Sequence, residues 1–197
     1  MSTVKSKKLQ VGTDATATNN FTIYQPSTPD GTLRIGVGNA DSPTEVGQFN
    51  SNGYVPTNAP SFKAVMSAVT AISNVGATKL VLNTEEWDTN SNYDTANYRF
   101  TPTVAGYYSL TGSMFVSAAT TSRVGVAIYK NGSEYAWQFM SGVTSAGGAN
   151  PQVSTIAYAN GSTDYFELYA AQNSSSSINA ASNSVITWFS GALVRSA

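Results

Sequence analysis

Apolar and polar residues alternate along many short segments of this chain. In the segment 107–116, one side is mostly large and apolar, while the other carries Tyr107 and Phe115 among serine and threonine. A period of two residues is that of a half-buried β-strand, whose successive side chains point to opposite faces of a sheet. We therefore expect the core-facing side of this strand to consist of Tyr108, Leu110, Met114 and Val116.

Segments of this kind recur at short spacing after residue 60. Their number and spacing predict an all-β, two-sheet antiparallel sandwich with strands at 79–82, 98–100, 107–116, 124–130, 135–140, 152–159, 165–171 and 185–194. The segment 61–74 has apolar residues close to helical spacing, but its first half is assigned to a strand because its surroundings are β. Two Asn-Gly-Ser triplets fit the glycosylation pattern and are predicted to be hairpin turns, at Asn131-Gly132-Ser133 and Asn160-Gly161-Ser162.

Residues 1–55 carry shorter and weaker strand signals. Candidates at 21–24 and 33–37 are separated by a turn with Asp30-Gly31, and Asn52-Gly53 marks a hairpin because both residue types tolerate positive φ. Large apolar residues are few, so we expect this segment to depend on a partner chain or another protein for burial. The candidate attachment residues are Phe21, Ile23, Tyr24, Leu33, Ile35, Val37 and Phe49.

The stretch Pro56-Thr57-Asn58-Ala59-Pro60 separates these two parts, because paired prolines interrupt regular structure. We predict a β-rich N-terminal attachment arm over residues 1–55 and a jelly-roll head over residues 56–197. A chain of 197 residues is long enough for a sandwich core and a small second unit.

Low charge narrows the choice of partners. Charged residues make up 11% of the chain, against roughly 25% in a typical soluble domain, and the net charge is −1. Neither nucleic-acid binding nor membrane insertion is expected, and the basic cluster Lys5, Lys7 and Lys8 is interpreted as a solvated arm. The first residues lack the apolar stretch of a secretory signal and no run of 18 apolar residues exists, so we expect synthesis in a cytoplasm.

The residue types needed for common catalysis are missing. Without histidine or cysteine, the Ser-His-Asp and Cys-His arrangements, disulfides and the usual zinc ligands are excluded. Glu85, Glu86 and Asp88 form a dense acidic cluster, which we expect to be an exposed strand-to-loop junction and not a glycosidase pair. Oxygen-bearing residues alternate over 88–94 as in a calcium loop, but the expected glycine is missing. We predict no catalytic residue, no cofactor and no resident metal.

Several motifs after residue 60 occur in an informative order: Pro60-Ser61-Phe62, the segment 82–94, Phe100-Thr101-Pro102 followed by Ala105-Gly106-Tyr107-Tyr108, Tyr129-Lys130-Asn131-Gly132, and the closing Trp188–Val194. Together they resemble the globular-head domain of complement component 1q, a relative of tumour necrosis factor, over about residues 60–197. The resemblance implies a ten-stranded jelly roll that associates as a tight homotrimer. Carried over by position, the candidate interface residues are Tyr107, Phe115, Tyr165 and Tyr169. Some family members bind calcium near the trimer apex, and the sequence leaves this open here.

The N-terminal part departs from the animal members of that family, because a short β-rich arm replaces a collagen-like stalk. The stretch 47–55 is similar to segments that precede such heads in bacteriophage virion proteins. This resemblance implies a non-enzymatic virion structural protein, either a capsid decoration (cement) protein or a head fibre. The alternative is a short tail fibre that binds a host-surface glycan or protein through loops such as 144–151 and 173–183. A depolymerase is a third, less favoured hypothesis.

Overall fold

A computed structural model describes residues 8–16, 19–39, 41–56, 59–116, 123–141 and 148–197. Within these ranges the chain forms eighteen β-strands and no α-helix, so the predicted all-β class is confirmed. The strands divide into two units, one on each side of the junction between residues 59 and 60.

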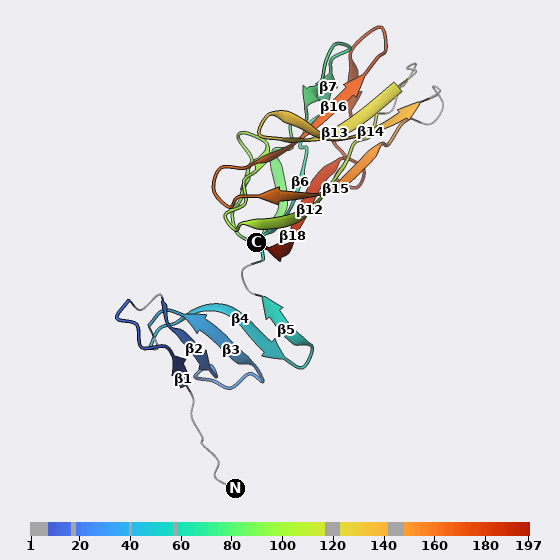
Figure 1. Ribbon diagram of the computed structural model, residues 1–197. Helices are drawn as coiled ribbons and strands as arrows, with labels where there is room; N and C mark the ends of the chain where they lie inside the picture. The colour runs from blue at the N-terminus through green and yellow to red at the C-terminus, as the bar shows by residue number, and fades with distance from the viewer. Residues whose placement is uncertain (1–7, 17–18, 40, 57–58, 117–122, 142–147) are drawn as a thin grey trace. The chain divides into compact units, whose positions relative to one another are not determined.

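The N-terminal unit, called the arm below, is a single antiparallel sheet (Figure 1). Each strand pairs with the next along the chain, in the order β1 (Lys8–Val11), β2 (Phe21–Tyr24), β3 (Leu33–Val37), β4 (Thr44–Asn50) and β5 (Gly53–Pro56). The predicted hairpin joins β4 to β5, where Gly53 has a φ of 104° and the Asn52 amide donates to Asn50 Oδ1 at 2.8 Å. Because β5 extends to Pro56, the arm includes the residue that we had placed at the start of the head.

The C-terminal unit, called the head, contains two antiparallel sheets and a short ribbon. Sheet I has the spatial order β15 (Gln152–Ala159), β12 (Gly106–Ser113), β18 (Trp188–Ser196), β6 (Ser61–Val65) and β9 (Thr84–Asp88). Sheet II has the order β10 (Tyr93–Asp94), β11 (Arg99–Phe100), β16 (Phe166–Gln172), β13 (Arg123–Lys130) and β14 (Ser133–Ser141), with β8 (Thr78–Lys79) also pairing with β16. The ribbon pairs β7 (Thr70–Ile72) with β17 (Ile178–Ala180). From β12 onward the chain crosses repeatedly between the sheets, which is the connectivity of a jelly roll.

Aromatic side chains from both sheets meet in the core of the head. Phe62 of β6 stacks on Phe100 of β11 with ring centroids 4.2 Å apart, and it meets Phe189 of β18 edge-on at 5.0 Å. The core face assigned to segment 107–116 from the alternation is confirmed, because solvent does not reach Tyr108, Leu110, Met114 and Val116. The alternation along this strand therefore identified its contribution to the core directly.

The segment 61–74 shows why the helical spacing there was misleading. It forms β6 and β7, and β6 sends Phe62 and Ala64 into the core with Lys63 between them. The small Ala64 conceals the period of two. Strands β7, β9, β10 and β17 were not predicted, because they have only two to five residues and no sustained alternation.

One of the two Asn-Gly-Ser triplets is a hairpin and the other is not. Asn131 and Gly132 both have positive φ, at 53° and 75°, and join β13 to β14 as predicted. Asn160 lies between β15 and β16, which belong to different sheets. Its Oδ1 atom accepts hydrogen bonds from the amides of Ser162 and Asp164. The side chain thus forms a local turn between sheets, and the hairpin prediction was wrong there.

Candidate association surfaces

One face of the arm sheet is built almost entirely from apolar side chains, with Thr44 opposite Val37 at the start of β4. The strand register aligns them in rows across the sheet: Val11, Phe21 and Val37 in the first, Leu9, Ile23 and Ile35 in the second, and Leu33, Phe49 and Tyr54 in the third. The second row continues to Gly47, whose missing side chain leaves room for the ring of Tyr54. Because side chains two residues apart share a face, this arrangement follows from the alternation in each strand.

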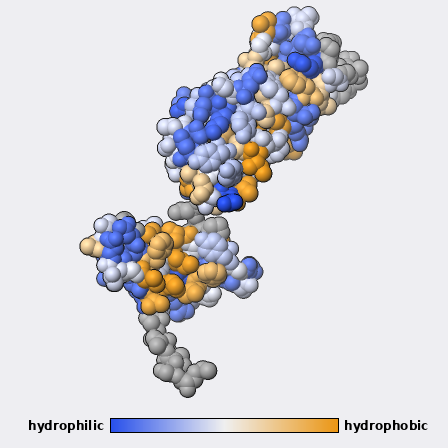
Figure 2. All heavy atoms as spheres, viewed as in Figure 1, coloured by the Kyte–Doolittle hydropathy of each residue, from blue (hydrophilic) through white to orange (hydrophobic). Residues whose placement is uncertain are grey.

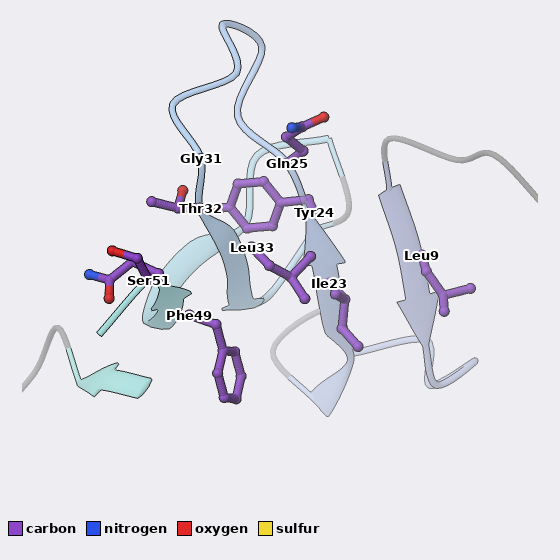
Figure 3. A pocket seen from close by; sticks show the side chains of 10 residues that line it. Leu9, Ile23, Tyr24, Gln25, Gly31, Thr32, Leu33, Phe49 and Ser51 are labelled. Carbon is purple, nitrogen blue, oxygen red and sulfur yellow. The ribbon is translucent and has the colours of Figure 1, made fainter. Parts of the chain in front are cut away.

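This apolar face is open to solvent, and no second layer of the described arm packs on it. Six of its side chains are 44–59% exposed, namely Leu9, Val11, Phe21, Leu33, Phe49 and Tyr54. Figure 2 shows apolar residues gathered over the middle of the arm between more polar margins. A cleft follows the face, and in Figure 3 Leu9, Ile23, Leu33 and Phe49 line it from four neighbouring strands. A continuous exposed patch of six large apolar side chains is characteristic of an association site.

The opposite face of the arm is polar and internally paired. Arg34 Nη1 lies 2.9 Å from Glu45 Oε2, and Arg34 also pairs with Asp30. The Asp30 carboxylate accepts hydrogen bonds from the Thr32 hydroxyl and amide at 2.6 and 3.0 Å. These bonds, together with the Arg34 guanidinium, lower the pKa of Asp30 to about 2. The arm sheet is therefore amphipathic, and the ion pairs among its described residues lie on one side.

Sheet I of the head exposes large side chains on its outward face. Tyr107 of β12 lies opposite Tyr158 of β15, with ring centroids 5.6 Å apart. Ile156 of β15 is 59% exposed, and Trp87 on the edge strand β9 is 47% exposed. Between these groups lies a shallow hollow lined mainly by small and hydroxyl-bearing residues, including Ser109, Thr111, Ser190, Gly191 and Ala192. The face thus offers both projecting apolar groups and a place that could receive them.

Rings on the outward face of sheet II pack against one another. Tyr129 stacks on Tyr169 at 4.0 Å, and Trp137 stacks on Phe139 at 4.9 Å. The guanidinium of Arg123 lies 4.0 Å from the centre of the Phe139 ring. Burial raises the pKa of Tyr129 to about 12. A cleft beside these rings combines aromatic and polar side chains, with Trp137, Phe139, Arg123, Glu134 and Gln172 in its lining.

Acidic side chains around β9 take part in local structure. Asp88 accepts hydrogen bonds from the amides of Asn90 and Tyr93, at 3.2 and 2.6 Å. Glu86 pairs with Lys63 Nζ at 2.7 Å. Among the residues that the structure describes, no three acidic side chains are grouped to hold a metal ion.

The same described residues include no helix long and apolar enough to cross a membrane.

Comparisons with known proteins address the head. No protein-family model matches the sequence, and no curated protein matches it. Solved structures match over about the length of the head. Murine APRIL is 10% identical with a TM-score of 0.56, covering 69% of this chain and 99% of that one. The Eiger tumour necrosis factor of S. frugiperda is 7% identical with a TM-score of 0.55, covering 71% and 93%.

The globular domain of zebrafish complement 1qA is 12% identical with a TM-score of 0.51, covering 70% of this chain and 98% of that one. The head has the fold of these domains. The predicted jelly roll, like that of tumour necrosis factor and complement 1q, is therefore confirmed. Identities this low show the fold alone.

Within this jelly roll, the four candidate interface residues do not come together. Tyr107 lies on the outward face of sheet I, while Tyr169 lies on the outward face of sheet II, stacked on Tyr129. Tyr165 precedes β16 and lies under the Arg99 guanidinium at 4.9 Å. Phe115 follows β12, half-buried, with its ring against the backbone at Gly148. Only Tyr107 therefore belongs to a broad exposed apolar surface.

Sequence reasoning missed the neighbours of Tyr107 on that surface. In β15 the outward side carries Ile156 and Tyr158, whereas Val153 and Ala157 face the core. The larger side chains of this strand point outward, which reverses the usual rule. That reversal is the sequence signal that would have revealed them.

Six of the seven candidate attachment residues share the apolar face of the arm. Tyr24 does not, because it pairs in register with Lys8 and Arg34 on the polar side. Its ring lies near Gly36 and borders the end of the cleft (Figure 3). Of the loop 144–151, considered for host binding, residues 144–147 lie outside the described residues, and within 173–183 the strand is the short β17.

Proposed function

We propose that this protein is a non-enzymatic structural component of a bacteriophage virion, homotrimeric through the outward face of sheet I. The arm anchors it to the capsid or to another virion protein, and the head stays exposed. The observation that carries this proposal is the pairing of a jelly-roll head with a separate, amphipathic β-sheet arm. A chain without histidine or cysteine also lacks the residues of Ser-His-Asp and Cys-His hydrolytic sites.

The trimer is supported by the shape and chemistry of sheet I. Ile156 and Tyr158 project at one edge, and the hollow around Ser109 and Ser190 lies toward the other. When one edge of a copy fits a different part of the next, the contact is heterologous, and a 120° rotation between copies closes such contacts into a ring of three. Tyrosine suits this role because it buries a large area while its hydroxyl keeps a polar partner.

Light scattering on the full chain tests the trimer. We expect the mass of three chains at micromolar concentration, and the mass of one chain for Ile156→Glu, because the interface would have to bury a charge. Val185→Glu is the matched control, since Val185 is 76% exposed and belongs to none of the strands of sheet I. A monomeric unmodified chain, or a trimer that Ile156→Glu leaves intact, would overturn the proposed interface.

Particle binding tests the role of the arm. A chain without residues 1–59 keeps the complete core of the head, so we expect a soluble trimer that no longer joins particles. Electron microscopy of particles carrying the full chain locates the protein on the particle. Density at capsid threefold axes supports a capsid decoration protein. Retained attachment of the shortened chain would contradict an anchoring arm.

A second candidate function, host binding by a short tail fibre, is favoured by the cleft on sheet II. Trp137 and Phe139 offer aromatic surface there, and Arg123 and Glu134 offer polar groups, a combination that suits a host-surface glycan. Glycan-array binding that disappears in Trp137→Ala, with particle density at the tail tip, would favour this function. No binding by the full chain on such an array would count against it.

A further inference from the structure

We infer that the apolar face of the arm is covered by the same face of the other two arms, so that three sheets enclose one shared core. This inference rests on the proposed trimer and names the partner of the arm. Its occupant is a second and third copy of this chain, and a different virion protein is the alternative that the test distinguishes.

The size of the face requires a cover. A fully exposed aromatic side chain presents roughly 150–250 Å² and an aliphatic one less, so three aromatic and three aliphatic side chains that are about half exposed present on the order of 500 Å². Stable interfaces bury about 800 Å² on each partner, and partly exposed Ile23, Ile35 and Val37 add to the total. A sheet with one apolar face is normally stable only as part of a layered structure.

The chemistry of the face favours a copy of itself. Its three rows contain apolar side chains, one tyrosine and one threonine, with no charged group and no amide side chain. A foreign partner is usually recognised through placed polar groups or charges, and these are confined to the opposite face, where Arg34 pairs with Glu45. Two apolar faces of this kind can pack against each other without matched charges or hydrogen bonds between them.

The short connection between arm and head keeps the arms of the three chains close together. Strand β5 ends at Pro56 and β6 begins at Ser61, so residues 57–60 alone connect the arm to the head. In a trimer of heads, short tethers hold the arms at an effective concentration on the order of millimolar. The arms then meet one another before they meet any partner in solution. Their polar faces, which include Tyr24, are left to contact the particle.

Single cysteines in the full chain test this arrangement cleanly, because the natural chain has none. Leu33→Cys places a thiol on the apolar face at a site that is 47% exposed in one arm, and Gln48→Cys is the control on the polar face. We expect maleimide labelling about tenfold or more slower at position 33, since a buried thiol reacts only when the interface opens. Oxidation should join two chains through position 33 but not through position 48.

Each result decides between the proposals. Phe21→Cys, in the opposite row of the face, repeats the measurement if Leu33→Cys misfolds. Fast labelling at both apolar positions in a protein that light scattering shows to be trimeric overturns the shared core and leaves the head trimer standing. Protection that develops only when particles are added assigns the face to a virion protein and also overturns it. A monomeric full chain instead contradicts the proposed function itself.

Discussion

Asp30 illustrates how single residues set local properties on the polar side of the arm. Its carboxylate accepts two hydrogen bonds from Thr32 and pairs with Arg34, which lowers its pKa from 3.8 to about 2. A carboxyl whose pKa is lower in the folded state stabilises that state above pH 3.8. This stabilisation is lost as the pH falls through about 2. The group is exposed, so salt weakens the contribution of Arg34.

Replacing the main hydrogen-bond donor tests this account. In Thr32→Ala we expect the pKa of Asp30 to rise toward 3.8, because the strongest interaction with the carboxylate is removed. A carboxyl NMR titration of the folded chain measures the change. Thr44→Ala, on the neighbouring strand β4, should leave the Asp30 titration unchanged. An unaltered pKa in Thr32→Ala would show that Arg34 dominates.

At the scale of the strand, the predictability of this fold depended on the size of alternating side chains. Segment 107–116 revealed its buried side because Tyr108 and Leu110 are large and their neighbours are mostly small. Strand β15 was assigned without faces, since its core-facing Ala157 is smaller than its exposed Ile156. Sequence alone therefore located the longer strands of the sandwich but not the broadest exposed face of the head. The assignment of strands to sheets depends on long-range pairing, which local patterns do not contain.

The same core gives a prediction at the scale of the element. Phe62 is fully buried among three aromatic rings, so Phe62→Ala should destabilise the head by about 3–5 kcal/mol. Denaturant unfolding followed by tryptophan fluorescence reports on the head alone, because Trp87, Trp137 and Trp188 all follow residue 60. Phe21→Ala, on the 50% exposed arm site, should leave that transition nearly unchanged. Equal shifts of the unfolding midpoint in both variants would mean that the arm and the head unfold as one unit.

At the scale of the whole molecule, the two proposed interfaces are coupled in one direction. The head has its own buried core, whereas the arm is a single layer whose apolar rows need a cover. Separating the heads therefore removes the effective concentration that keeps the arms together, and the arm sheet should then open far more often. Hydrogen exchange measures this by amide protection.

In Ile156→Glu we thus expect the amides of β3, the central strand of the arm, to lose protection while those of β13 in the head keep theirs. Val185→Glu should leave the amide protection of both strands as it is in the unmodified chain. The coupling runs in one direction. Leu33→Glu on the arm should also remove the amide protection of β3, but it should leave the heads trimeric. Full protection of β3 in the monomeric Ile156→Glu chain would mean that the arm is stable as a single sheet, and the apolar face would then be free for a partner other than its own copies.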